Sequence, residues 1–181
     1  YAYDDACNAA NSIIVSGGNV FCHSVNNDGI DSNGTISVSG GTVVASGTNV
    51  PEGGFDCDFQ NNFSVTGGTL IGIGGTNTLP STASTQCSLA YGGLTAAKGA
   101  TLKIVNSNNT AVLSYKLHRT LTGLALIVSS PQIKKDSYTI TADDKQAGSF
   151  TVSTTVTSVG VSNMGGGGPG GGGGPGGGGM Q

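Results

Sequence analysis

The stretch TISVSGGTVVASG, residues 35–47, decides the fold because the same pattern occurs both before and after it. SIIVSGGNVFCHS begins at residue 12, and NFSVTGGTLIGIG begins at residue 62. Each stretch reads as a short alternating strand, a Gly-Gly corner that permits positive φ, and a second short strand. The equivalent residues Ser16, Ser39 and Thr66 are 39 − 16 = 23 and 66 − 39 = 27 positions apart. Such repeats predict a parallel β-helix with one repeat per coil.

Stacked coils would bring equivalent residues within about 4.8 Å of one another. Counting back from the Gly-Gly corners therefore predicts columns of neighbouring side chains. The expected columns are Asn8 with Asp31 and Asp58, Cys7 with Ile30 and Cys57, and Asp5 with Asp28 and Phe55.

The composition supports an all-β, extracellular or cell-surface protein. Only 9% of the residues are charged, Trp is absent, and Gly, Ser, Thr, Asn and Val dominate, as in proteins with many short strands and turns. Four cysteines fit an oxidising compartment. No apolar run approaches the roughly 18 residues of a membrane span.

The chain divides into three predicted units. Residues 1–79 contain the repeats, residues 80–164 contain strand-like runs and hairpin turns of an antiparallel β module that caps the coil, and residues 165–181 are a Gly/Pro tail. Pro169 and Pro175 are six positions apart, so both would lie on one edge of a polyproline II helix. Such a tail is long enough to reach a neighbouring subunit.

Charge is distributed unevenly between the first two units. Residues 1–79 carry seven acidic side chains and no Lys or Arg, whereas all seven basic residues lie in residues 98–145 beside three aspartates, giving −7 and 7 − 3 = +4. This asymmetry favours self-association, with the acidic coil of one copy against the basic module of the next.

The aspartates in the repeats are candidate calcium ligands. Stacked carboxylates repel one another, so a cation or a proton must compensate them, and calcium accepts several carboxylate, amide and carbonyl oxygens. The predicted ligands are Asp5, Asp28, Asp31, Asp56 and Asp58. The alternative is that DG and SNG are turn formers whose side chains bind local backbone groups.

Several stretches resemble the bacterial secreted carbohydrate-binding β-helix proteins. They are DGIDSNGTISVSGGTVVASG, GGFDCDFQNNFSVTGGTLIGIG, STASTQCSL and IVSSPQIKKDSYTI, followed by a glycine-rich tail with scattered prolines. The resemblance implies a right-handed parallel β-helix like that of pectate lyases, bound calcium, and non-catalytic binding of plant-type polysaccharide. Cysteines at 57 and 87 stand where the resemblance leads us to expect aromatic residues near the junction of coil and cap. It therefore implies a Cys57–Cys87 pair, which leaves Cys7 and Cys22 within one coil.

Other functional classes are less well supported. A polysaccharide lyase needs a basic residue beside its calcium, and residues 1–79 contain no Lys or Arg. A hydrolase would need paired carboxylates, which Asp28 with Asp31, or Asp56 with Asp58, formally supply. His23 and His118 are isolated in the sequence and are expected to be surface or packed residues. A pI of about 5.0 with few basic residues argues against nucleic-acid binding.

Two functions of different class remain. One is a non-catalytic β-helix that binds polysaccharide together with calcium. The other is a self-assembling structural subunit of an extracellular filament or surface layer, joined through its coil ends and its glycine-rich tail.

Overall fold

The computed structural model describes residues 1–59 and 62–161. All of the regular elements in these residues are β-strands, which confirms the all-β class. The predicted tail, with Pro169 and Pro175, lies outside the described residues.

The repeats form the first six strands. They are β1 (Asn8–Ala9), β2 (Ser12–His23), β3 (Ile30–Ser32), β4 (Thr35–Ser46), β5 (Phe55–Cys57) and β6 (Phe63–Gly74). The following module contains β7 (Ser88–Ala96), β8 (Thr101–Asn106), β9 (Ala111–Lys116), β10 (Leu121–Ser129), β11 (Asp136–Ala142), β12 (Lys145–Val152) and β13 (Val156–Val159).

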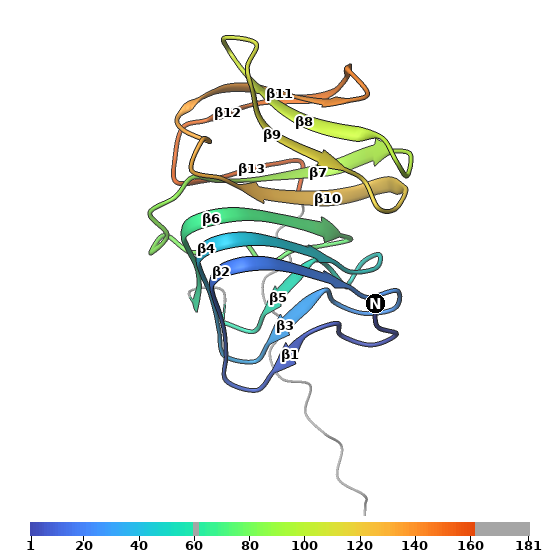
Figure 1. Cartoon of the computed structure of the whole chain (residues 1–181), viewed down its shortest axis with the longest axis vertical. Coiled ribbons are helices and arrows are strands. Elements are labelled where there is room, and N and C mark those ends of the chain that lie inside the picture. Colours follow the sequence, from blue (N-terminus) through green and yellow to red (C-terminus); the bar gives the residue numbers. More distant parts are fainter. Residues whose placement is uncertain (60–61, 162–181) are drawn as a thin grey trace, which may run out of the picture.

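Three sheets contain these strands (Figure 1). The short strands pair in parallel in the order β1-β3-β5, and the long strands form part of a six-stranded sheet, β13-β7-β10-β6-β4-β2. A four-stranded sheet, β12-β11-β8-β9, lies at the other end of the molecule. In the described part of the chain the repeats thus form two parallel sheets rather than one closed helix. The parallel stack ends at β6 because the next strand beside it, β10, is antiparallel.

The structure corrects the register predicted for the third repeat. Asp31 pairs with Asp56 rather than with Asp58, because the offset between these strands is 56 − 31 = 25. The offset reaches 63 − 36 = 27 only where Ile36 pairs with Phe63. The offset between the first two repeats is 31 − 8 = 23, so the third repeat is longer by 27 − 23 = 4 residues. Two of these additional residues precede β5 and two follow it. A single count back from the Gly-Gly corner misses this division.

The other predicted columns shift for the same reason. Ile30 pairs with Phe55, and Cys57 pairs with Ser32. Phe55 is therefore not in a column with Asp28, and Cys57 is not in a column with Ile30.

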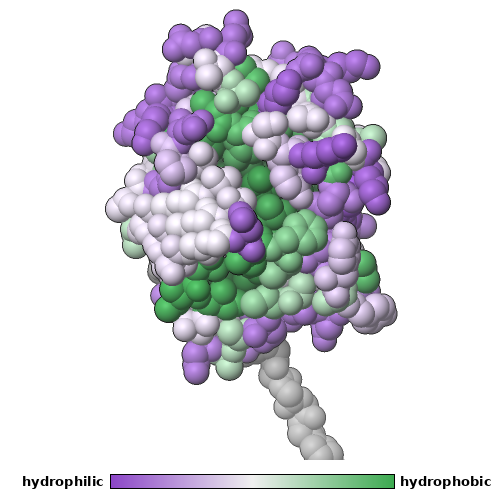
Figure 2. Space-filling view, viewed as in Figure 1, coloured by the Kyte–Doolittle hydropathy of each residue, from purple (hydrophilic) through white to green (hydrophobic). Residues whose placement is uncertain are grey.

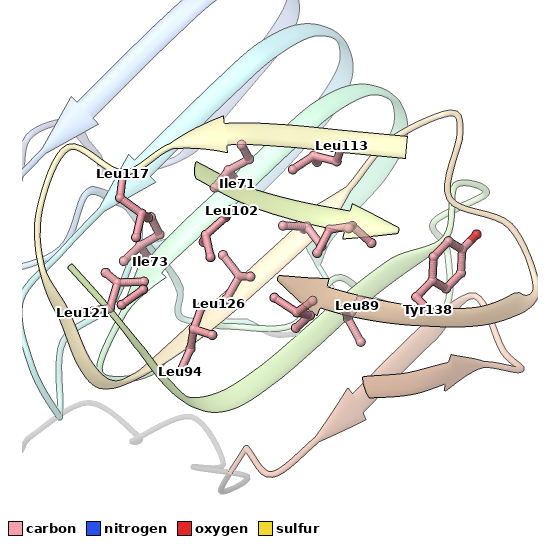
Figure 3. Close-up of a cluster of buried hydrophobic side chains, with 14 of the residues drawn as sticks. Ile71, Ile73, Leu89, Leu94, Leu102, Leu113, Leu117, Leu121, Leu126 and Tyr138 are labelled. Carbon is pink, nitrogen blue, oxygen red and sulfur yellow. The ribbon is translucent and has the colours of Figure 1, made fainter. Parts of the chain in front are cut away.

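Two hydrophobic clusters lie on opposite faces of the long strands. The inner cluster fills the space between the two parallel sheets, and its buried members are Ile30, Ile36, Val38, Val43, Ala45, Phe55, Cys57, Phe63, Val65, Leu70, Ala90 and Ile127. The outer cluster joins β4 and β6 to β7–β12. Its members drawn in Figure 3 include Ile71, Ile73, Leu89, Leu94, Leu102, Leu113, Leu117, Leu121, Leu126 and Tyr138.

Both faces of β6 are therefore covered along its second half. Leu70 belongs to the inner cluster, whereas Ile71 and Ile73 belong to the outer one. A strand buried on both faces reads as a nearly continuous apolar run, and LIGI at residues 70–73 is such a run. The six-stranded sheet and both clusters contain residues from the repeats and from the module.

The Gly-Gly corners stack on one another through their backbones. Gly18, Gly41 and Gly68 have φ of 78°, 79° and 80°. A Cβ on Gly41 would lie 2.6 Å from the carbonyl carbon of Gly17, and one on Gly68 would lie 2.7 Å from that of Gly40. The corners need glycine for both its backbone conformation and its lack of a side chain.

Alanine substitutions at four corner glycines separate these two requirements. Gly17→Ala adds neither strain nor contact, since nothing lies within 4 Å, and is expected to change the free energy of unfolding by less than about 0.5 kcal/mol. Gly18→Ala adds only an unfavourable φ, about 1–2 kcal/mol. Gly40→Ala places a Cβ 2.5 Å from the Ser16 carbonyl oxygen without positive φ, about 1–3 kcal/mol.

Gly41→Ala combines both effects and is expected to destabilise the chain most. Urea denaturation of the four variants measures the differences. Equal losses for the Gly18 and Gly41 variants would show that the corners are not closely stacked.

Candidate functional site

The side chains that alternate with the inner cluster along β1, β3 and β5 form an acidic row. Parallel pairing aligns Asn8, Asp31 and Asp56. The Asn8 amide donates to Asp5 Oδ2 at 2.9 Å and to Asp31 Oδ2 at 2.7 Å. Thr78 Oγ1 donates to Asp56 Oδ1 at 3.1 Å. The acidic row, defined as Asp5, Asn8, Asp31 and Asp56, thus presents carboxylate and amide oxygens along one face.

Negative charge accumulates around Asp31. Burial raises the pKa of this carboxyl to about 6, and the charges of Asp5, Asp56, Asp58 and Glu52 raise it as well. No Lys or Arg occurs in residues 1–79 to offset them. A bound cation would favour the ionised form and reverse this effect.

Asp28 lies beside the row but is buried, with 6% of its surface exposed. Its Oδ1 accepts the Gly53 N–H at 2.5 Å, and its own N–H donates to Asp5 Oδ1 at 3.2 Å. Burial raises the pKa of Asp28 to about 8, which the Gly53 hydrogen bond opposes and the neighbouring Asp56 and Glu52 reinforce. Burial and the neighbouring carboxylates thus favour the protonated form of the Asp28 carboxyl.

The five predicted metal ligands do not form one cluster. Asp5, Asp31 and Asp56 share the acidic row, Asp28 is buried beside it, and Asp58 lies beyond β5, where its N–H donates to the Ser32 carbonyl. Within residues 1–59 and 62–161, no group of three or more His, Cys, Asp or Glu side chains is arranged to hold a metal ion. Any cation here would take most of its ligands from other sources.

Two members of this site were not predicted as ligands from the sequence. Glu52 adds charge beside Asp28, and Asn8 links two carboxylates through its amide. Asn8 was already expected in the Asp31 column, so its position was a usable signal. Glu52 had no such signal, because it precedes β5 in the segment where the repeat length changes.

A second polar site lies where the module meets the outer face of β2. The rings of His23 and His118, distant in sequence, lie 4.9 Å apart at their centroids, and Phe21 contacts His118 edge-on at 5.0 Å. Tyr115 Oη is 2.7 Å from His118 Nδ1. Burial, followed by the neighbouring His23, lowers the pKa of His118 to about 4, so this contact is made by a neutral ring. The sequence left open whether the two histidines are surface or packed residues, and in the structure both are packed.

The structure does not contain the Cys57–Cys87 bond that the resemblance implied. All four thiols are free, and Cys57 Sγ donates to the carbonyls of Gly34 and Phe59 at 3.4 and 3.6 Å. Cys57 belongs to the inner cluster, whereas Cys87 packs against the outer one. The intervening six-stranded sheet separates them.

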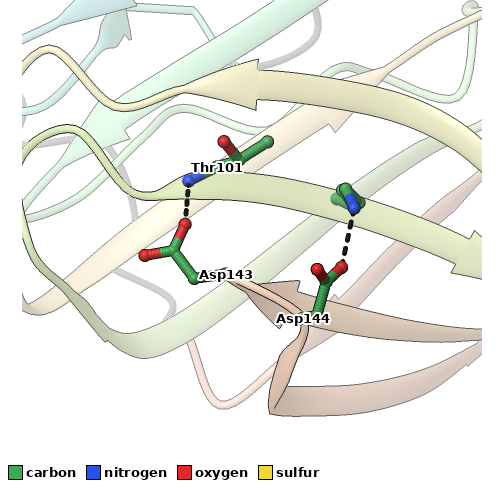
Figure 4. Close-up of polar contacts among 4 residues, drawn as sticks. Thr101, Asp143 and Asp144 are labelled. Atoms are coloured by element: carbon green, nitrogen blue, oxygen red, sulfur yellow. Dashed lines mark hydrogen bonds and ion pairs between the residues drawn. The ribbon is translucent and has the colours of Figure 1, made fainter.

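The basic module has its own acidic partners. Lys103 Nζ lies 2.7 Å from Asp144 Oδ1, and the Thr101 N–H donates to Asp143 Oδ1 at 2.9 Å (Figure 4). Asp143 and Asp144 form the turn between β11 and β12, with φ of 47° and 63°. This ion pair lies within the module and does not neutralise the acidic row.

Comparisons with protein-family models, curated proteins and solved structures give no match to this chain. The described residues include no helix with the length and apolar character to cross a membrane.

Replacing Asp28 tests its protonation. A carboxyl whose pKa is raised on folding favours the folded state below its unfolded pKa of about 4, and this contribution is lost as pH rises toward 8. Asp28→Asn keeps the Oδ1 acceptor for Gly53 and carries no charge. The variant is expected to gain on the order of 1–3 kcal/mol over the native chain between pH 4 and pH 8.

Urea denaturation across this pH range gives the difference, in calcium-free buffer. Asp4→Asn, at an exposed position in the same unit, is the matched control and should run parallel to the native chain. A constant difference between the Asp28 variant and the native chain from pH 4 to pH 8 would contradict the assignment.

Proposed function

We propose that this chain is an extracellular, non-catalytic protein that binds polysaccharide together with calcium. In this proposal the three repeats are coils of a short right-handed parallel β-helix, and the acidic row is the binding face. The observation that carries the proposal is the row of uncompensated carboxylates, in which Asp31 has a raised pKa and no basic partner among the residues that the structure describes.

Calcium suits this face better than a smaller or softer cation. It binds six to eight oxygen ligands with flexible geometry, whereas the row supplies carboxylates from Asp31 and Asp56 and the amide oxygen of Asn8. The remaining ligands would be water or oxygens of the polysaccharide. An incomplete protein site therefore favours a calcium ion that is shared with the bound sugar.

The same face lacks the groups that catalysis would need. A lyase requires a base beside calcium, and the repeats contain no Lys or Arg. Asp28 is the carboxyl with the most strongly raised pKa, as a general acid would require, but it is buried. Binding without turnover is the function that these side chains support best.

A double substitution tests the role of the acidic row. The native chain is expected to be retained on an immobilised acidic polysaccharide with calcium and released by a chelator, with a cellulosic resin as the second arm. Asp31→Asn with Asp56→Asn should weaken retention by about tenfold or more, because two calcium ligands lose their charge.

The control is Asp143→Asn with Asp144→Asn, which removes the same charge from the module, where asparagine tolerates the positive φ. The proposal would be refuted if retention were the same with and without calcium and the same for the native chain and the Asp31/Asp56 variant. Equal losses of retention in both double variants would show that retention depends only on the net charge of the chain.

A second candidate function, self-association as a structural subunit, is favoured by the outer edge of β2. The residues of β2 that face the inner cluster, Ile13, Val15 and Val20, are half-buried, whereas their neighbours on β4 are fully buried. Ile14 and Phe21, which alternate with these residues on the opposite face of β2, are 71% and 44% exposed. Figure 2 shows hydrophobic side chains gathered at the surface of the repeats. In the described residues no strand pairs with the outer edge of this 12-residue strand.

The geometry of such an assembly differs from a simple stack of coils. At the other end of the repeats β6 is already paired with β10, so β2 is the open end of the parallel stack within the described part of the chain. Two copies meeting at β2 would be related by a two-fold axis, which pairs the strands antiparallel.

A charge on the β2 edge tests this candidate. Ile14→Lys should shift the sedimentation profile toward monomer, because lysine on an edge strand opposes pairing with another strand. Val50→Lys, at another exposed apolar position (60% exposed), is the control and should leave association unchanged. A native chain that sediments as a monomer at all concentrations, with calcium at low salt, would contradict self-association.

A further inference from the structure

Two columns of side chains face each other across the interior of the repeats. One column follows the short strands: Cys7 precedes the paired residues of β1 and its carbonyl accepts the Asp31 N–H, which places it beside Ile30, and Ile30 pairs with Phe55. The other column follows the long strands and contains Cys22, Ala45 and Gly72, which pair in that order.

The third repeat shows that these columns are in contact. A Cβ on Gly72 would lie 2.7 Å from Cδ2 of Phe55, so the phenyl ring already extends to the opposite backbone. In the second repeat the corresponding residues are Ile30 and Ala45, both buried in the inner cluster. Each repeat therefore fills the same gap with a complementary pair: a phenyl ring opposite a hydrogen, a branched alkyl group opposite a methyl, and in the first repeat two thiols.

The two thiols meet in the gap that the other repeats fill with hydrocarbon. Cys7 and Cys22 are both partly buried and pack against the inner cluster. Burial raises the pKa of the Cys22 thiol, and Cys7, in hydrogen-bond contact with it, raises it further. A disulfide requires two Cβ atoms about 3.5–4.5 Å apart, a separation that facing positions in so narrow a space can adopt.

We propose that Cys7 and Cys22 form a disulfide that links the two parallel sheets across the first repeat. The two thiols together lose two protons and two electrons, and the S–S bond of an oxidant such as glutathione disulfide is broken to give two thiols. The reaction passes through a mixed disulfide with one protein sulfur, which the second displaces.

The proposed disulfide lies in the first repeat, whose interior side chains are the most exposed to solvent of the three repeats. The first repeat has an open outer edge in the described residues, and its interior side chains are half-buried. A disulfide here would close a loop of 22 − 7 = 15 positions and restrict the unfolded chain where burial stabilises least. Cys57 and Cys87 would remain thiols, because the sheet separates them.

Peptide mapping distinguishes the Cys7–Cys22 link from every other pairing. Residues 1–79 contain no trypsin site, so cleavage before aspartate is needed. This cleavage places Cys7 and Cys22 together in peptide 5–27, Cys57 in peptide 56–57 and Cys87 in peptide 58–135. The full chain is incubated with glutathione disulfide, its remaining thiols are alkylated, and it is then digested.

The expected product is peptide 5–27 without alkyl groups and about 2 Da lighter than its dithiol form, as the loss of two hydrogens requires. The same peptide carrying two alkyl groups, or joined to peptide 56–57 or to peptide 58–135, would overturn the proposal.

Thermal unfolding gives an independent readout. The oxidised native chain should melt roughly 5–10 °C above the reduced chain. Cys7→Ser and Cys22→Ser should each abolish this difference, whereas Cys87→Ser should retain it. The comparison of oxidised and reduced native chain needs no substitution, so a poorly folding variant does not prevent the test. Equal melting temperatures in the native chain would refute a stabilising link.

Discussion

Parallel backbone pairing between successive repeats is the constraint on which the rest of the structure depends. It aligns β2, β4 and β6 on both sides of their Gly-Gly corners and holds the short strands in the same stack. The corners can follow only if adjacent backbones approach closely, and this is why a side chain on Gly41 or Gly68 would collide with the corner above it. Once the corners are stacked, each paired strand position acquires a fixed neighbour in the next repeat.

The module after the repeats shares a sheet and two hydrophobic clusters with them. β10 continues the sheet beside β6, and the outer cluster covers the second face of β4 and β6. Because these strands are buried on both faces, their apolar side chains are divided between two clusters, as Leu70 and Ile71 are. The stability of the repeats and that of the module are therefore coupled through the same strands.

Stacking also generates the electrostatic character of the candidate site. Side chains that alternate with the core along short strands form a row, and the row repeats whatever charge each strand carries. Asp31 has acidic neighbours on both sides, and the pKa of its carboxyl rises as a result of burial and of those charges. The proposed calcium-dependent binding and the proposed disulfide both follow from this repetition, one on the outer side of the short strands and the other on their inner side.

The sequence by itself determined the all-β class, the three repeats and their Gly-Gly corners, because these depend on local pattern and backbone freedom. It also placed Asp31 next to Asn8, where the repeat length is constant. Only the tertiary structure decided that Asp56 rather than Asp58 continues this row, because the extra residues of the third repeat are divided between two loops and neither loop has a periodic pattern. Only the tertiary structure shows that His118 of the module contacts His23 of β2. A contact between distant segments depends on how the sheets pack and leaves no signal in the local sequence.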